Sequence, residues 1–330
     1  MDVGAVAPPQ RSLGRSGLSV GPIGYGVAAL GNLYRAVPDG VWQGAVPAAW
    51  DAGIRYFDVA PHYGLGVAEE RLSEGLRGMP RDEYILSTKV GRLIEPNPDY
   101  RPGQTDIDNL FAVPANRRRR LDYSRDGVLR SVEDSLNRLG VDRIDILFVH
   151  DPDDHEREAL DGAFPGLEEL RSQGVIRAYG AGMNQSAMLA RFVRNTDLDV
   201  VMCAGRYTLL DRSAERDLLP AALQRDVSVV AAAVFNSGIL ATDRPTGGAK
   251  YDYGAAPAPL ISRANRIARV AEHYGLTLPE LAVQFPLRHP AVATVVLGSA
   301  SAKQITRNAA LTDSVAPDDL WLELEAEGLI

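Results

Sequence analysis

The chain has 330 residues and a formal net charge of −8, with 43 acidic residues against 35 basic ones. This length suits one large barrel or two ordinary domains, and the acidic surplus argues against a surface for duplex DNA or an anionic membrane. Because Cys203 is the only cysteine, internal disulfides and a cysteine-based zinc site are excluded.

The first residues, MDVGAVAPPQ, lack the basic start and apolar run of a signal peptide. No apolar run approaches membrane-spanning length. We therefore expect a cytoplasmic protein whose partner is a small molecule, not a nucleic acid or a membrane; the oligomeric state stays open. The segment Arg11–Val20 precedes the first expected strand and should form a small hairpin plug.

Short apolar runs alternate with helical patterns along the chain, which predicts crossover connections and a parallel sheet. The expected strands are Pro22–Tyr25, Arg55–Val59, Tyr84–Lys89, Ile144–His150, Ile176–Gly180, Val200–Cys203, Ser228–Ala232 and Thr294–Leu297. Eight such strands predict the α/β class and a single (β/α)₈ TIM barrel over residues 1–330, with its active site on the loops after the strands.

The expected helix Gly127–Leu139 has apolar residues at three-to-four spacing. Asp126 is the expected cap of this helix, and Gly140 its end. Two long loops interrupt the alternation: Arg92–Tyr123 after strand three, and Asn236–Pro259 after strand seven. Loops of this length beside the ligand-binding end of a barrel predict lids. The run Arg117–Arg120 in the first loop is interpreted as a solvated face.

Polar residues stand at or just past the ends of three expected strands. Asp58 ends one strand and Tyr63 follows in its loop, while Lys89 and His150 end the next two strands. Polar groups at the ends of buried parallel strands are costly unless they are paired. We therefore expect these four side chains to converge at the barrel mouth and to carry the chemistry.

The residue types indicate proton transfer to or from an oxygen. A tyrosine titrates near 10 in water, and a nearby Lys89 ammonium, held by Asp58, should lower the pKa of Tyr63. His150 could donate a hydrogen bond to a substrate oxygen where negative charge develops. The set contains no nucleophile, which disfavours hydrolysis through a covalent intermediate.

Two competing interpretations are weaker. The sequence GYGVAA at Gly24–Ala29 matches a dinucleotide-binding fingerprint, but the acid that ends the next strand, Asp58, lies much further on than the usual roughly 20 residues. The sequence HDPDDH at His150–His155 could suggest a metal, but the other histidines show no ligand spacing. We expect no metal; Asp151 and Asp153 are candidates for capping a helix or contacting substrate.

The sequence resembles the aldo-keto reductase family. The matching segments are LGRSGLSV at Leu13–Val20, DVAPHYG at Asp58–Gly64, the strand-end Lys89, VHDPD at Val149–Asp153 and GSASAKQITRN at Gly298–Asn308. The resemblance implies a nicotinamide-dependent barrel in which Asp58, Tyr63, Lys89 and His150 form the catalytic tetrad. Tyr63 would be the general acid or base, and His150 would orient the carbonyl.

The same resemblance implies a cofactor site. Asn184 would bind the nicotinamide carboxamide, the loop NSGIL at Asn236–Leu240 would surround the pyrophosphate, and residues near Asn308 would lie by the adenosine. The full expected set is Gly26, Asn184, Phe235, Asn236, Ser237, Gly238, Leu240, Gly298, Ser299, Gln304 and Asn308. A 2′-phosphate needs a cation, and positions that are often basic in NADP-using relatives hold Gly298, Ala300 and Gln304. NAD is therefore favoured, with NADP as the alternative.

The chain departs from the family pattern at two positions. The usual glutamine near the end of strand six aligns with Ala204, and the aromatic that commonly stacks on the nicotinamide aligns with Ala232, so Phe235 or Tyr207 could replace that ring. The segments CAGRYTLLD and VFNSGIL resemble the branch with D-threo-aldose 1-dehydrogenases, L-fucose dehydrogenases and pyridoxal 4-dehydrogenases. That resemblance implies oxidation of a cyclic hemiacetal to a lactone.

The alternatives are a general NADPH-dependent aldehyde or ketone reductase and a non-catalytic, cofactor-binding regulatory subunit. The intact tetrad argues against the second. The expected substrate pocket is lined by Tyr25, Trp42, His62, Phe111, Asp151 and Arg206, and the two long loops should set its shape.

Overall fold

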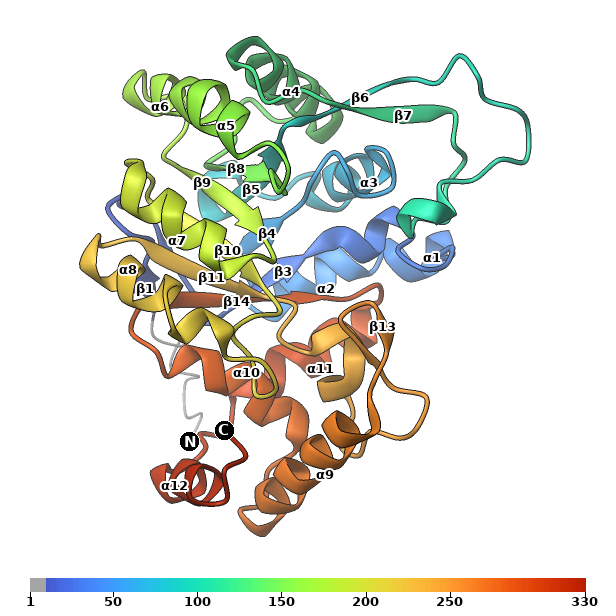
Figure 1. Ribbon diagram of the computed structural model, residues 1–330. Coiled ribbons are helices and arrows are strands. Elements are labelled where there is room, and N and C mark those ends of the chain that lie inside the picture. Colours follow the sequence, from blue (N-terminus) through green and yellow to red (C-terminus); the bar gives the residue numbers. More distant parts are fainter. Residues whose placement is uncertain (1–9) are drawn as a thin grey trace.

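The computed structural model describes residues 10–330, which contain a closed barrel of eight parallel strands (Figure 1). The strands are β3 (Ile23–Gly26), β4 (Tyr56–Asp58), β5 (Ile85–Val90), β8 (Ile146–His150), β9 (Ala178–Met183), β10 (Val200–Ala204), β11 (Ser228–Ala232) and β14 (Val292–Gly298). Around the barrel their order is β10-β11-β14-β3-β4-β5-β8-β9. The predicted (β/α)₈ barrel is confirmed; the expectation about a signal peptide concerns the chain's start, where residues 1–9 lie outside the described range.

Helices surround the strands (Figure 1). They are α1 (Asp39–Trp42), α2 (Ala45–Asp51), α3 (Val67–Leu76), α4 (Arg125–Leu139), α5 (Glu156–Glu158), α6 (Phe164–Ser172), α7 (Ser186–Asn195), α8 (Leu218–Gln224), α9 (Ala258–His273), α10 (Leu278–Leu287), α11 (Ala302–Ala309) and α12 (Asp318–Ala326). None of the helices between residues 10 and 330 is both long and apolar enough to span a bilayer.

The helix α4 shows how local sequence sets an element's ends. Its N-cap is Ser124, whose hydroxyl accepts a hydrogen bond from the backbone of Gly127, so the predicted cap at Asp126 is wrong by two residues. Asp126 lies instead in the first turn, where a negative charge suits the helix dipole. Gly140 ends the helix with φ 63°, as expected for a left-handed C-terminal residue.

The inward side chains of the strands fill the barrel, and the N-terminal hairpin closes the end at which the strands begin. The hairpin pairs β1 (Arg11–Ser12) with β2 (Ser19–Val20). Its apolar side chains join the interior cluster that includes Tyr56, Phe148 and Met202. The Arg11 guanidinium donates to the carbonyl of Val292 at 2.7 Å. The predicted plug is therefore confirmed, and it leaves the opposite end of the barrel open for a ligand.

The segment after β5 is an antiparallel arm and not an irregular loop. It pairs β6 (Arg92–Pro96) with β7 (Arg117–Leu121) and projects away from the barrel (Figure 1). The four consecutive arginines form most of β7, so they are not in a loop, although three of them are 40 to 50% exposed, as expected for a solvated face. Arg119 is only 11% exposed and pairs with Asp106, whereas Arg118 is 50% exposed. Strand alternation sends neighbouring arginines to opposite faces.

The segment after β11 begins with a helical turn, η6 (Asn236–Ala241), and continues into a small hairpin of β12 (Lys250–Tyr251) and β13 (Gly254–Ala255). Tyr253, at the tip of the hairpin, donates its backbone N–H to the Ser237 hydroxyl at 2.9 Å. The hairpin is therefore attached to the turn that follows the barrel strand.

Candidate active site

The ends of β4 and β5 hold a buried ion pair at the barrel mouth. Lys89 Nζ lies 3.0 and 2.8 Å from the two Asp58 carboxylate oxygens, and it also donates to the Val59 carbonyl at 2.9 Å. Asp58 accepts a further bond from the Ser87 hydroxyl at 2.7 Å. These strands pair in parallel, with Asp58 opposite Ser87. The ammonium is thus fully bonded and fixed in place.

Lys89 stays charged although it is almost completely enclosed. Burial alone would lower the pKa of Lys89, but Asp58 and Tyr63 outweigh that effect and raise the pKa above its ordinary value. Lys89 Nζ lies 4.9 Å from the centre of the Tyr63 ring. The expected proximity of Lys89 and Tyr63 is therefore confirmed.

The pKa of Tyr63 differs from the prediction. Burial raises it to about 12, although the charge of Lys89 and a hydrogen bond from it act in the opposite direction. The predicted value below 10 is wrong, because loss of hydration destabilises the phenolate more than one ammonium stabilises it. In this state of the protein Tyr63 is a phenol at neutral pH. It is ready to donate a proton.

His150 is a neutral imidazole beside Tyr63. The two ring centres are 5.8 Å apart. Burial lowers the pKa of His150 well below its ordinary value, and the charges of Lys89 and Arg92 act in the same direction. The ring nitrogen Nδ1 is buried and has no hydrogen-bond partner within residues 10–330. The other ring nitrogen, Nε2, lies 3.5 Å from the Asp151 carboxylate.

The end of β8 is held by a tyrosine from outside the tetrad. The Tyr123 hydroxyl is 2.8 Å from the carbonyl of His150 and 2.9 Å from that of Asp151. Asp151 has φ 41°, a left-handed value, and its carboxylate pairs with Arg92 at 3.1 Å. Burial raises the pKa of Asp151 to about 6. A carboxylate with strained backbone at the barrel mouth fits a ligand-contacting position.

The β6–β7 arm contributes Arg119, which fixes His62 at the barrel mouth. Arg119 Nε donates to Nδ1 of His62, and Nη2 donates to the His62 carbonyl oxygen at 2.8 Å. Nη1 and Nη2 donate to the Asp106 carboxylate at 2.8 and 2.6 Å. Burial lowers the pKa of His62 to about 2, with Arg119 adding to that effect. The His62 ring centre lies 5.6 Å from that of His150 and 5.3 Å from that of Phe111. His62 is thus a neutral, fixed part of the catalytic surroundings.

These groups border one cavity of about 480 Å³. The predicted site residues along its wall are Gly26, Asp58, His62, Tyr63, Lys89, Phe111, His150, Asp151, Asn184, Phe235, Asn236, Ser237, Gly238 and Gly298. The structure therefore brings together the whole tetrad, half of the predicted substrate residues and most of the predicted cofactor residues.

Three predicted pocket residues do not line this cavity, and their assignment is corrected. The Tyr25 ring is buried in the barrel wall, and its hydroxyl donates to the Ser299 carbonyl at 2.9 Å. The Trp42 ring packs beneath Arg71 on the outer layer. Arg206 lies behind the cavity wall, where it pairs with acidic residues. Each side chain has a partner that draws it away from the open space.

Four predicted cofactor residues lie near the cavity but not on its wall. Leu240 is buried in the core, and Asn308 donates to the Ser299 hydroxyl at 2.9 Å. Gln304 accepts from the Ala300 backbone at 3.1 Å. Ser299, Gln304 and Asn308 lie between the end of β14 and the end of α11, in a segment that adjoins Gly298, which does line the cavity, whereas Leu240 lies in η6.

Of the two rings considered for stacking, Phe235 lines the cavity. Tyr207 instead packs against Phe285, with ring centres 5.2 Å apart. Tyr207 is therefore corrected to a core residue.

Several lining residues were not identified from the sequence. They include Tyr34, Leu110, Asp252 and Tyr253. They lie away from the ends of the eight barrel strands, and no motif in the local sequence marks them.

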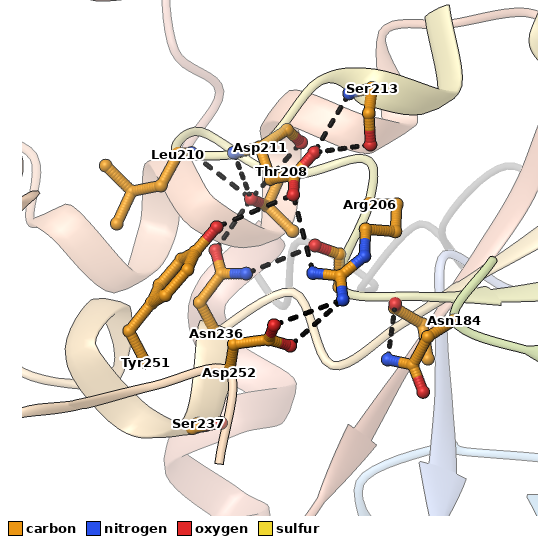
Figure 2. Close-up of polar contacts among 12 residues, drawn as sticks. Asn184, Arg206, Thr208, Leu210, Asp211, Ser213, Asn236, Ser237, Tyr251 and Asp252 are labelled. Carbon is orange, nitrogen blue, oxygen red and sulfur yellow. Dashed lines mark hydrogen bonds and ion pairs between the residues drawn. The ribbon is translucent and has the colours of Figure 1, made fainter. Parts of the chain in front are cut away.

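The cavity wall suits a nicotinamide cofactor. The Asn184 amide is fixed by donating to the Ala204 carbonyl at 3.0 Å, which leaves its oxygen available (Figure 2). Asn236 is likewise held, between the Thr208 hydroxyl and the Gly205 carbonyl, at 2.6 and 3.3 Å (Figure 2). A Cβ at Gly26 would approach Val296 to 2.7 Å, so only glycine fits this part of the wall. Backbone and fixed amides here can face an extended polar ligand.

Comparison with known proteins decides the family. The aldo/keto reductase family model matches residues 22–326. The chain belongs to this family. It is an oxidoreductase with a nicotinamide cofactor, in agreement with the resemblance seen in its motifs.

The similar proteins cover nearly the whole chain. A D-threo-aldose 1-dehydrogenase from Pseudomonas sp is 46% identical over 96% of both chains. A pyridoxal 4-dehydrogenase from Microbacterium luteolum is 42% identical over 98% of both. The holo form of an aldo-keto reductase from Bacillus halodurans is 26% identical, with a TM-score of 0.75 over 97% of this chain and 96% of that one. No group of three or more acidic, histidine or cysteine side chains suited to a metal occurs among residues 10–330.

Proposed function

We propose that this aldo/keto reductase oxidises a cyclic hemiacetal to a lactone with NAD. The observation that carries the proposal is the tetrad on one cavity wall, with Lys89 bonded to Asp58 and facing Tyr63. The two relatives named above, both dehydrogenases by name, support the direction of the reaction. The cofactor, when bound, accepts the hydride from the substrate carbon.

The tetrad residues then transfer the proton. In oxidation the substrate hydroxyl gives its proton to the Tyr63 oxygen as the carbon loses hydride, and a carbonyl forms. His150 donates a hydrogen bond to the same substrate oxygen and orients it. Lys89 stabilises the phenolate form of Tyr63, and Asp58 holds Lys89 in place. In the reverse direction Tyr63, as a phenol, returns the proton to the carbonyl oxygen.

A hydroxylated sugar ring fits the polar groups beside the tetrad. The Asp151 carboxylate and the His62 imidazole border the cavity along with Tyr63 and His150. A carboxylate accepts hydrogen bonds from sugar hydroxyls, and a closed ring presents its C–H in a fixed geometry, which limits the entropy lost in reaching the transition state. The aromatic side chain of Phe111 offers an apolar wall, which makes the aldehyde of a pyridine ring the second candidate.

The segment at the start of α11 supports NAD over NADP. Ala300 and Gln304 bond to each other and offer no positive charge. Arg307 faces Asp243 at 3.6 Å, so its charge is partly used. A 2′-phosphate would lack a bidentate partner here. Asn184, Asn236, Ser237 and Gly298 would hold the remainder of the cofactor.

The test is NAD⁺ reduction across L-fucose, D-arabinose, L-galactose, pyridoxal and propanal, with the product examined for a lactone carbonyl. We expect at least one of the sugars to be oxidised to its lactone, with NAD⁺ giving the higher kcat/KM. Efficient reduction of propanal without oxidation of any sugar or pyridoxal would support the general reductase instead. No turnover in either direction, with cofactor still bound, would support a regulatory subunit.

A further inference from the structure

The tip of the β12–β13 hairpin has an unusual choice of residues. Lys250 pairs with Ala255 and Tyr251 with Gly254, so Asp252 and Tyr253 alone form the turn. Both have positive φ, 46° and 65°. Hairpin turns with two positive φ values favour a small residue, usually glycine, at the second position. A tyrosine is disfavoured there because its Cβ is crowded by the backbone.

The turn is fastened on both sides. The Asp252 carboxylate accepts from Arg206 at 3.1 and 3.2 Å, and Arg206 also reaches Asp211 at 3.4 Å (Figure 2). On the other side, the backbone of Tyr253 donates to the Ser237 hydroxyl at 2.9 Å. These contacts overcome the conformational preference of the tip and hold it over the barrel mouth.

The fastened tip places Tyr253 on the wall of the catalytic cavity. Asp252 and Tyr253 border it together with Tyr63, His150 and Asn184. Burial raises the pKa of Tyr253, and a hydrogen bond with Asn184 opposes that rise, while the negative charge of Asp151 adds to it. The phenol thus lies among groups of the active site, although the side chain is 53% exposed from outside.

A second exposed tyrosine, Tyr34, borders the same cavity. It is tied to the β6–β7 arm, its backbone donating to the Leu110 carbonyl at 2.7 Å. Lys250 Nζ, from the hairpin, lies 4.9 Å from the centre of the Tyr34 ring. The hairpin therefore contacts Tyr34 beside the cavity that both border.

We propose that Tyr253 is a substrate-recognition residue whose hydroxyl binds a ring hydroxyl of the sugar, and that Arg206 and Asp252 position it. This inference rests on the proposed oxidation of a hydroxylated hemiacetal. It explains why the turn holds a tyrosine where glycine would fit better, because the side chain is needed in the cavity. Strained backbone of this kind gathers at ligand-binding sites.

The test compares Tyr253→Phe with Tyr251→Phe, a matched control on the same hairpin whose hydroxyl points to Asp211 outside the cavity. The measured quantity is the ratio of kcat/KM for L-fucose, D-arabinose or L-galactose oxidation to kcat/KM for propanal reduction. Tyr253→Phe should lower this ratio about fivefold to tenfold through the KM of the sugar, as expected for one lost hydrogen bond. Tyr251→Phe should change the ratio less than about twofold.

Two further variants separate recognition from folding. Tyr253→Gly should keep or raise the melting temperature, because glycine accepts φ 65° freely, and should lower the ratio at least as much as Tyr253→Phe. Asp252→Asn should raise the sugar KM with little change in kcat. Combined with Tyr253→Phe, its effect should not add, because both act through one contact.

Three outcomes would overturn this inference, and they distinguish its failure from that of the proposed function. A wild-type protein that oxidises none of the three sugars overturns the proposed function and this inference with it. A wild-type protein that oxidises a sugar, with an unchanged ratio in Tyr253→Phe, overturns this inference alone. A Tyr253→Phe protein with weaker NADH binding, measured by fluorescence titration, and the same ratio would assign the tyrosine to the cofactor and also overturn it.

Discussion

At the scale of single residues, the proposed chemistry depends on one phenol. Tyr63→Phe keeps the ring that packs beside His150 but removes the hydroxyl proposed to exchange a proton with the substrate. We expect kcat to fall at least about a hundredfold, the lower end for loss of a general acid or base. NADH titration by fluorescence should show cofactor binding within about twofold of wild type, since phenylalanine preserves the packing. Near wild-type turnover would remove Tyr63 from its assigned role.

The pKa of Tyr63, raised to about 12, has opposite consequences for the two directions. Oxidation needs the phenolate, which is a minor form at neutral pH, so kcat/KM should rise about tenfold per pH unit between pH 6 and 9. Reduction needs the phenol, which is present throughout that range, so its kcat/KM should be nearly flat. Stopped-time assays in both directions give the two profiles. A plateau of the oxidation profile below pH 8 would contradict a raised pKa.

Lys89→Met tests whether the Lys89 ammonium limits the rise in the pKa of Tyr63. The substitution removes the ammonium that opposes the effect of burial on Tyr63, so the remaining oxidation should shift to still higher pH and fall at least about a hundredfold at pH 8. It also leaves Asp58 buried without its ion-pair partner, so thermal unfolding must be measured alongside. A folded variant with an unshifted profile would separate Lys89 from the titration of Tyr63.

At the scale of elements, the β6–β7 arm allows a buried arginine to be compared with an exposed neighbour. Arg119 and Arg118 are neighbours on β7, but Arg119 is buried against Asp106 and holds His62, whereas Arg118 lies 4.0 Å from the exposed Asp99. Arg119→Met should reduce the free energy of unfolding by about 3 kcal/mol, because Asp106 loses its partner. Arg118→Met should cost at most about 1 kcal/mol. Urea unfolding measures both.

Loss of Arg119 should also reach the active site. Without it the His62 ring loses its anchor, so the KM for substrate should rise in Arg119→Met and stay near wild type in Arg118→Met. Equal effects of the two substitutions on stability and KM would show that the arm is not fixed by the buried pair.

The helix α11 offers a test of cofactor preference. Ala300→Arg places a guanidinium two residues after Gly298, which lines the cavity. We expect kcat/KM with NADP⁺ to rise about tenfold relative to that with NAD⁺, because arginine binds phosphate in a bidentate manner. Ala309→Arg, at the C-terminal end of α11, is the control and should leave the ratio unchanged. A wild-type preference for NADP⁺ would contradict the proposal for NAD.

At the scale of the whole molecule, closure of the barrel depends on close strand contacts. A Cβ at Gly180 in β9 would lie 1.6 Å from the Val200 carbonyl oxygen, whereas one at Gly182 would meet only ordinary contacts, the nearest at 3.5 Å. Gly180→Ala should therefore force β9 and β10 apart and cost roughly 3 kcal/mol or more of stability. Gly182→Ala should unfold near the wild-type temperature. Equal melting temperatures would show that the barrel yields at this contact.

The sequence by itself determined the barrel and its tetrad. Eight apolar runs alternating with helical patterns leave one economical solution, a closed parallel sheet, and all eight predicted strands occur. Strand ends point to one mouth, so Asp58, Lys89 and His150 could be placed together before any coordinates. The hairpin plug and the end of α4 at Gly140 followed from equally local signals.

Only the tertiary structure decided what lies around the tetrad. The pKa of Tyr63 depends on how completely its neighbours exclude water, and the sequence records the charge of Lys89 but not that enclosure. Tyr25 lies in β3 and Trp42 ends α1, and the partners of these aromatic residues place them in the barrel wall and in the outer layer. Tyr253 lies on the cavity wall in a turn that Arg206, far away in sequence, contacts through Asp252. Such contacts join segments that are distant in sequence. Neither segment's local sequence predicts them, because they form only when the whole chain has folded.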